Sequence, residues 1–225
     1  LCNDKHMPSS MMLNLDGNSI KTELFTNQIT ASEPLKKNIW KQTVEAKIKN
    51  QAALLQKTDN HSGDVLSFCG KVKSGDSTNR EGAAARLYWP RLFGQGFIRE
   101  RYGKPPNMLL NYGYTVLRAA VARALTGSGL LPTLGIFHHN RYNSFCLADD
   151  IMEPYRPFVD NCVYNIYQED PEKLIIDRGD KLKLLEVLTT DVIINKKMRP
   201  LMVALSQTTA SLARCFAQET RRMQY

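Results

Sequence analysis

Apolar residues recur at helical spacing along most of the chain. The clearest case is residues 107–125, where the pattern predicts one long helix that ends at Gly127 and Gly129. A second long helix is predicted over residues 35–55, and Ser32-Glu33-Pro34 is a typical start for it, with Ser as the cap and Pro in the first turn. The three consecutive alanines at 83–85 predict a helix that a neighbouring helix can approach closely.

The second half of the chain continues in the same way. An apolar stripe predicts a long helix around residues 147–166, and Pro154 and Pro157 predict a kink or a restart in it because each removes a helix hydrogen bond. Further helices are predicted over 177–187 and from Pro200 onward, with a short extended turn at 190–196 between them. No strand pattern or internal repeat is persuasive. The predicted fold is therefore all-α, with the helices in a single multi-helix domain.

The composition narrows the possible partners. Thirty Lys and Arg against 22 Asp and Glu give a formal charge of +8, so the surface should attract phosphate groups. The sequence contains no apolar run of 18 residues, which predicts no membrane span. The five cysteines are scattered without a CxxC pair, which argues against structural zinc and suits a reducing cytoplasm.

The residues with the most chemical potential lie between 135 and 157, in GIFHHNRYNSFCLADDIMEPYRP. Imidazole and carboxylate side chains together are typical ligands of a divalent cation. The alternative is a surface loop followed by an ordinary helix start, with Asp149 or Asp150 as the cap and Glu153 in the first turn. Upstream, Glu81 precedes the alanine-rich helix, where it is either a first-turn residue favoured by the helix dipole or a third ligand for the same cation.

Taken together, these segments resemble the CRISPR-associated endonuclease and integrase family Cas1, and in particular its type II branch. The resemblance rests on four segments in a fixed order: NREGAAA at 79–85, NMLLNYGYTVL at 107–117, GIFH at 135–138 and SFCLADDIMEPYRP at 144–157. It implies a helical, metal-dependent catalytic domain over residues 23–225. Residues 1–22 would be a remnant of the family's N-terminal β domain together with a linker.

The resemblance also implies roles for particular residues. Glu81, His138 and Glu153 would be the catalytic residues and the ligands of a Mg²⁺ or Mn²⁺ ion. Asp150, His139 and Arg156 would be further ligands or would support the first three. Arg99, Arg101, Lys104 and Arg141 are the candidates for DNA contact.

The activity implied by the resemblance is insertion of protospacer DNA into a CRISPR array, in which a 3′-hydroxyl attacks a phosphodiester of the repeat. The implied partners are double-stranded DNA, both protospacer and repeat, and the small protein Cas2, with homodimers in the full-length family. Two alternatives stay open. One is a non-catalytic DNA-binding scaffold, and the other is a metal phosphohydrolase acting on nucleotides, although no GxxxxGK[ST] loop is present for the latter.

Overall fold

The structure, a computed structural model, describes residues 20–225, and most of these residues are helical. The α-helices are α1 (Lys21–Ile29), α2 (Glu33–Lys57), α3 (Gly63–Ser67), α4 (Arg80–Phe93), α5 (Asn107–Gly127), α6 (Cys146–Met152), α7 (Arg156–Glu169), α8 (Arg178–Glu186) and α9 (Leu201–Phe216). The shorter elements are the 3-10 helices η1 (Cys69–Lys71), η2 (Ser74–Asp76), η3 (Glu153–Tyr155) and η4 (Val187–Thr189), with strands β1 (Asp191–Ile194) and β2 (Lys197–Pro200). The predicted all-α class is confirmed.

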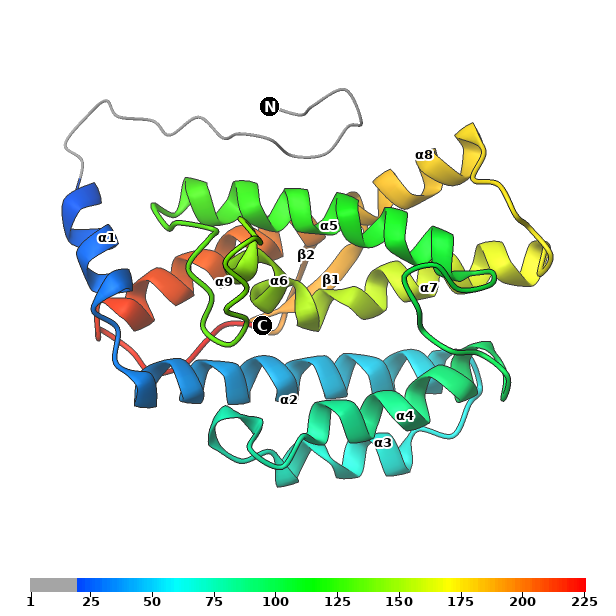
Figure 1. Cartoon of the computed structure of the whole chain (residues 1–225), viewed down its shortest axis with the longest axis horizontal. Coiled ribbons are helices and arrows are strands. Elements are labelled where there is room, and N and C mark those ends of the chain that lie inside the picture. The colour runs from blue at the N-terminus through cyan, green and yellow to red at the C-terminus, as the bar shows by residue number, and fades with distance from the viewer. Residues whose placement is uncertain (1–19) are drawn as a thin grey trace.

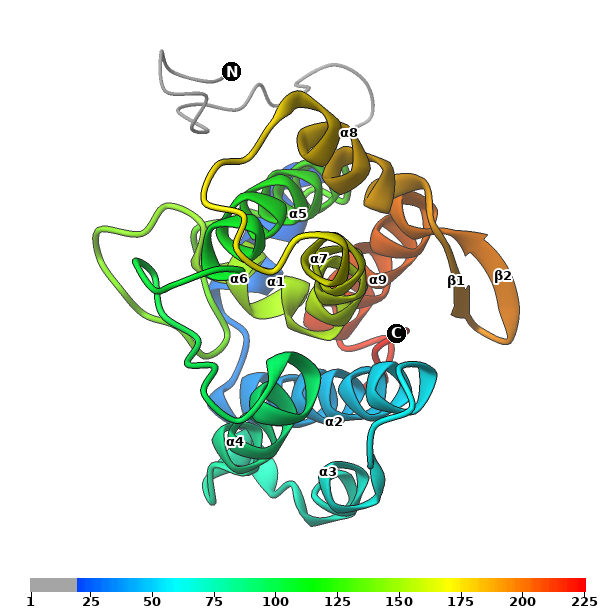
Figure 2. The same ribbon diagram turned by 90° about the vertical axis from the view of Figure 1, so that its right-hand side faces the viewer.

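The helices pack in two groups. Helices α2, α3 and α4 lie on one side of the molecule, and α5, α6, α7 and α9 lie on the other (Figures 1 and 2). Helix α2 joins the two groups because it contacts α4 on its own side and α6, η3 and α7 on the other. Catalytic chemistry that needs residues from both groups would therefore be assembled along α2.

The core follows from the apolar stripes of the longest helices. Helix α2 buries Ile39, Val44, Ile48 and Leu55 completely, and α5 likewise buries a run that includes Leu117. Removing side chains of this size from water stabilises the fold by about 1.5–3 kcal/mol each, which fixes α2 and α5 as the two long supports of the molecule.

The sequence also predicted where several helices begin and end. Pro154 interrupts the chain at η3, so that α6 and α7 are separate helices, as the two prolines predicted. Helix α8 starts after Asp177, which exchanges side-chain and backbone hydrogen bonds with Asp180 in a capping box.

One local prediction needs correction, and one helix was missed. The predicted short extended turn at 190–196 is part of an antiparallel hairpin, in which Val192 pairs with Arg199. The turn is formed by Asn195 and Lys196, both with positive φ, and such a two-residue turn suits the twist of a hairpin. Helix α1 was not predicted at all; its Gln28 side chain bonds to both the backbone N and O of Leu131, a contact that no local pattern reveals.

The predicted boundary between the β remnant (1–22) and the helical domain (23–225) falls inside α1. Residues 1–19 of that remnant lie outside the described residues. Within residues 20–225, none of the helices is both long and apolar enough to cross a membrane.

Candidate metal and DNA site

Glu81 is positioned by an unusually well-capped start of α4. The buried Asp76 carboxylate accepts hydrogen bonds from the backbone N of Arg80 at 2.8 Å and of Glu81 at 2.9 Å. Asn79 adopts the left-handed conformation, and its side chain accepts from the N–H of Gly82 at 3.0 Å. Because three free N–H groups of the first turn are satisfied in this way, the backbone beneath the Glu81 side chain is fixed.

Glu153 is positioned by the break between α6 and α7. Pro154 forces the chain into η3, and its carbonyl O, which an uninterrupted helix would use internally, accepts a hydrogen bond from Nδ2 of Asn50 at 2.7 Å. Asn50 belongs to α2, so η3 is tied to the other group of helices. Glu153 is 4% exposed, which makes its carboxylate a buried charge that needs partners.

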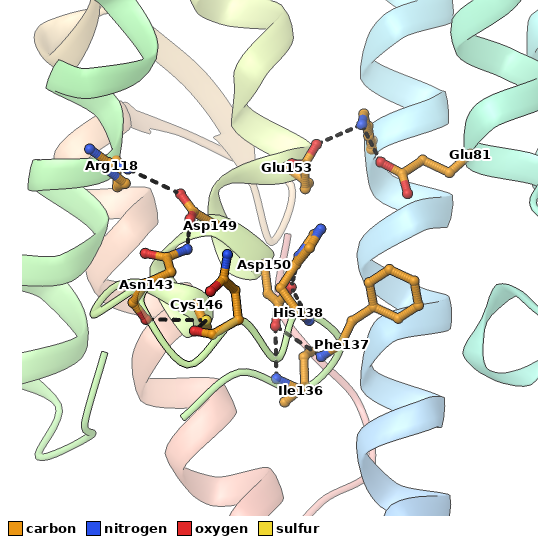
Figure 3. A network of polar contacts seen from close by, with 12 residues as sticks. Glu81, Arg118, Ile136, Phe137, His138, Asn143, Cys146, Asp149, Asp150 and Glu153 are labelled. Atoms are coloured by element: carbon orange, nitrogen blue, oxygen red, sulfur yellow. Dashed lines mark hydrogen bonds and ion pairs between the residues drawn. The ribbon is translucent and has the colours of Figure 1, made fainter. Parts of the chain in front are cut away.

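Those partners are two cations. Lys47 Nζ lies 2.6 Å from Glu153 Oε2 and 2.5 Å from Glu81 Oε1, so one ammonium group joins the two predicted ligands. Arg156 Nη2 lies 2.9 Å from the other oxygen of Glu153, and its guanidinium also stacks over the Tyr114 ring at 4.4 Å. Figure 3 shows the Glu81 and Glu153 side chains directed toward each other across the face of α2, with His138 close by.

His138 is held by Asp150. Its Nδ1 lies 2.5 Å from Asp150 Oδ1, which leaves Nε2 as the nitrogen for another ligand. The same carboxylate accepts the backbone N–H groups of Ile136 at 2.7 Å, Phe137 at 3.0 Å and His138 at 3.2 Å (Figure 3). Asp150 has no exposed surface, so both of its oxygens are committed to holding this loop.

The loop that carries His138 is fixed from two further directions. Phe137 stacks on the buried Trp40 of α2, with ring centroids 4.2 Å apart and planes 4° from parallel. Gly135 packs so closely that a Cβ there would lie 2.2 Å from the backbone O of His138. The G-I-F-H motif therefore needs glycine for close approach and an aromatic residue for docking on α2.

The charges stabilise one another. Burial raises the pKa of Glu153, but the positive charges of Arg156 and Lys47 lower it by more, so that its pKa lies below the ordinary value. Burial lowers the pKa of Lys47, and the two glutamates more than restore it, so that its pKa lies above the ordinary value. The hydrogen bond to Asp150 raises the pKa of His138. Glu153 and Glu81 make the smallest contributions to that rise.

A second buried network lies behind this cluster. Asp160 of α7 accepts hydrogen bonds from the hydroxyls of Tyr88 on α4, at 2.7 Å, and of Tyr114 on α5. Burial raises the pKa of Asp160 to about 6, although both tyrosines oppose this. Because Tyr114 also supports Arg156, the two networks are in contact.

Comparison with known proteins agrees with this arrangement. The family model described as CRISPR associated protein Cas1 matches residues 7–173. The CRISPR-associated endonuclease Cas1 of Neisseria meningitidis serogroup C is 37% identical over 93% of this chain and 69% of its own length. The chain belongs to the Cas1 family.

Other Cas1 relatives and solved structures support the same fold. A CRISPR-associated endonuclease Cas1 of Francisella tularensis subsp. novicida is 32% identical over 68% of this chain, which spans only 55% of that relative. Among solved structures, the Cas1 protein TM1797 of Thermotoga maritima superposes with a TM-score of 0.69 at 19% identity, covering 90% of this chain and 70% of its own. A casposase bound to integration product superposes with a TM-score of 0.76 at 20% identity, covering 92% and 72%.

The structure brings the three predicted ligands of this Cas1 chain to one region but does not close them around one point. Within residues 20–225, no group of three His, Cys, Asp or Glu side chains is already arranged as a metal site. Lys47 lies between Glu81 and Glu153 instead. Convergence of Glu81, His138 and Glu153 on one ion therefore stays a prediction.

The remaining predicted residues are more widely placed. His139 and Arg141 are exposed and line a surface cavity of about 700 Å³ beside His138. Arg101 and Lys104 are exposed on the loop before α5, whereas the Arg99 guanidinium is bonded to the side chains of two asparagines at the start of that helix. The loops 94–106 and 128–145 lie on the same side of the molecule (Figure 2).

The sequence analysis did not identify Lys47 as part of the site. The Lys47 side chain is only 11% exposed. The signal was available: positions 40, 44, 51 and 54 form a buried stripe on α2, and Lys47 lies within that stripe.

Proposed function

We propose that this chain is a divalent-metal-dependent DNA endonuclease and integrase. The observation that carries the proposal is the meeting of Glu81 and Glu153, from helices of opposite groups, around one cationic group beside His138. Buried carboxylates that face each other are costly unless a cation lies between them. In a Cas1 chain, this arrangement supports a cation site between α4, α6 and α7.

The donor set suits Mg²⁺ or Mn²⁺. Two carboxylates supply the hard oxygen ligands that Mg²⁺ prefers, and one imidazole makes Mn²⁺ equally acceptable. Glu81, Glu153 and Nε2 of His138 would hold the ion, while Asp150 fixes the histidine from behind. When bound, such an ion supplies charge stabilisation at the scissile phosphate.

The reaction we propose is a transesterification. The 3′-hydroxyl of the incoming strand gives up its proton to solvent, and its oxygen forms a bond to the scissile phosphorus. The existing bond from that phosphorus to the 3′-oxygen of the target strand breaks, and the departing oxygen takes up a proton from solvent. No residue of the chain is covalently attached at any stage. The chain's part is to bind and orient: Asp150 and Trp40 hold the His138 loop, and Arg156 holds Glu153.

DNA and Cas2 are the partners we propose. The net charge of +8 and the exposed Arg101, Lys104 and Arg141 favour a polyanion on the side where the two loops lie. A solved structure titled Cas6-RT-Cas1–Cas2 complex, with a TM-score of 0.72 over 95% of this chain, contains a protein of the same fold. Homodimerisation, which the family resemblance implies, is proposed as well.

Glu81→Gln tests the proposed function. This change keeps the size of the side chain and removes its charge, so strand transfer should fall by about a hundredfold or more, the scale of losing one electrostatic group at the reacting phosphate. DNA affinity should be unchanged or slightly higher, because a negative charge is lost from the site. Glu33→Gln, at an exposed residue near the start of α2, is the matched control. Full metal-dependent strand transfer by Glu81→Gln would refute the site.

A further inference from the structure

Lys47 is placed as a component of the site and not as a surface lysine. Its side chain is 11% exposed, and those of Glu81 and Glu153 are 23% and 6% exposed. Trp40 and Gln51, which share its face of α2, are both buried, so the packing of α2 directs Lys47 into the gap between the helix groups. An ammonium group within 2.6 Å of each glutamate lies where a cation shared by both carboxylates would lie.

The charges of this cluster balance without a metal ion. Glu81 and Glu153 carry two negative charges, and Lys47 and Arg156 carry two positive charges. Asp150 is satisfied separately by His138 and by three backbone N–H groups. A divalent ion entering this cluster would add two positive charges next to Lys47, in a partly buried environment where repulsion is weakly screened.

A DNA phosphate would relieve that repulsion. It supplies negative charge at the position next to the ion, and it offers Lys47 a new acceptor when the ion takes the carboxylates. The lysine side chain has a flexible stem and a compact charge, so it can exchange one oxygen partner for another.

We propose that Lys47 is an internal counter-ion that makes metal binding depend on the arrival of a DNA phosphate. This inference rests on the proposed function, since it assigns Glu81 and Glu153 to the metal. In the free protein Lys47 holds the carboxylates, and in the DNA complex it turns to a non-bridging phosphate oxygen. The consequence is an enzyme that carries little bound metal until its substrate is present.

The test is a titration of Mn²⁺, followed by electron paramagnetic resonance, with and without a short DNA duplex that lacks the repeat sequence. The full chain is used as wild type, Lys47→Met and Lys49→Met. Lys49 is an exposed lysine two residues further along α2, so it controls for loss of one positive charge. Thermal melts show whether each variant is folded, and Lys47→Gln replaces Lys47→Met if the latter is not.

The wild type should bind Mn²⁺ weakly in the absence of DNA, and DNA should increase the Mn²⁺ affinity by about tenfold or more, a typical coupling between two ligands. Lys47→Met should bind Mn²⁺ about tenfold more tightly than the wild type without DNA, and DNA should add less than about threefold. Lys49→Met should behave like the wild type. Equal Mn²⁺ affinity of Lys47→Met and wild type in the absence of DNA would overturn the inference.

Glu81→Gln separates this inference from the proposed function. If Glu81→Gln loses Mn²⁺ binding while Lys47→Met has no effect, the metal site stands and the role of Lys47 fails. If Glu81→Gln keeps full Mn²⁺ affinity, the metal site itself is wrong and the role of Lys47 falls with it.

Discussion

Asp150→Asn should separate the support of His138 from the metal ligands themselves. The substitution preserves the shape of the side chain but removes its charge and replaces one acceptor oxygen by an NH₂ donor. Oδ2 of Asp150 serves Ile136 and Phe137, and Oδ1 serves the backbone and ring nitrogens of His138. The asparagine oxygen can take over only one of these two sets.

The cost can be estimated from the bonds that are lost. With the asparagine oxygen facing Ile136 and Phe137, its NH₂ group meets the partly buried backbone N–H of His138, and one unsatisfied donor costs about 1–3 kcal/mol. Loss of the charge weakens the remaining bonds, so the total is about 2–4 kcal/mol. For a chain of this size the melting temperature should fall by about 5–10 °C.

The effect on metal binding has a different origin. An NH₂ group opposite Nδ1 requires that nitrogen to be an acceptor, which moves the proton to Nε2 and removes the lone pair that would bind the ion. Changing a group that orients a histidine ligand typically costs about 10–100-fold in metal affinity. Mn²⁺ titration measures the affinity, and nitrogen NMR of the His138 ring reports the tautomer.

Asp149→Asn is the matched control, because it changes the neighbouring carboxylate. Asp149 bonds to Asn143 at 2.7 Å and lies 3.9 Å from Arg118, and it does not contact His138 (Figure 3). It should change neither Mn²⁺ affinity nor the tautomer. If Asp150→Asn loses stability but keeps the wild-type tautomer and Mn²⁺ affinity, Asp150 only supports the fold, and the assignment of Nε2 as the ligand atom loses its basis.

Two further predictions concern the packing around the site. Asp160 has a folded pKa of about 6 against 3.8 for the free side chain, so its contribution to the stability of the folded state is complete below pH 3.8 and is lost as the pH rises through 6. Relative to Asp160→Asn, the wild type should therefore lose about 3 kcal/mol of unfolding free energy between pH 3 and pH 7, measured by urea denaturation, and a difference that does not change with pH would contradict this pKa. Gly135→Ala places a Cβ 2.2 Å from the His138 carbonyl oxygen, so it should lower the free energy of unfolding by about 1–3 kcal/mol and weaken Mn²⁺ binding. Gly127→Ala, where nothing lies within 4 Å of the new Cβ, should do neither. Equal thermal melts for the two variants would show that the loop around Gly135 rearranges without cost.

The sequence predicted the helices well because their signals are local. Helix α5 begins at Asn107 as predicted and extends two residues past Leu125, and the proline break after Glu153 lies where the missing hydrogen bonds require it. The hairpin was missed because its turn is Asn-Lys, without the glycine that usually marks such turns. In the sequence Val192, Ile193 and Ile194 form an unbroken apolar run, and the alternation of buried and exposed positions that is typical of a strand appears only in the structure.

The sequence led to candidate ligands, whose role stays a prediction, but it did not reveal the residues that position them. Histidine and carboxylate types in a fixed order pointed to Glu81, His138 and Glu153 through the family resemblance. Nothing in a linear pattern shows that Asn50 bonds to the Pro154 carbonyl, 104 residues away. Lys47 shows most clearly what the sequence does not reveal. A lysine is normally expected to be exposed to solvent, and only the position of Lys47 within the buried stripe of α2 indicates otherwise.

A buried hydrogen bond lies further along the chain from each of the two glutamates. Tyr88 lies seven residues after Glu81 on α4, and Asp160 of α7 lies seven residues after Glu153 of η3. The bond from Tyr88 to Asp160 at 2.7 Å joins α4 to α7, and Lys47 joins Glu81 of α4 to Glu153 of η3. The first link is a hydrogen bond from the neutral Tyr88 hydroxyl to the buried Asp160, and the second link is made by the ammonium group of Lys47. We infer that the bond from Tyr88 to Asp160 keeps α4 and α7 together when the cation between Glu81 and Glu153 is exchanged. This is the property that a site loaded only in the presence of substrate requires.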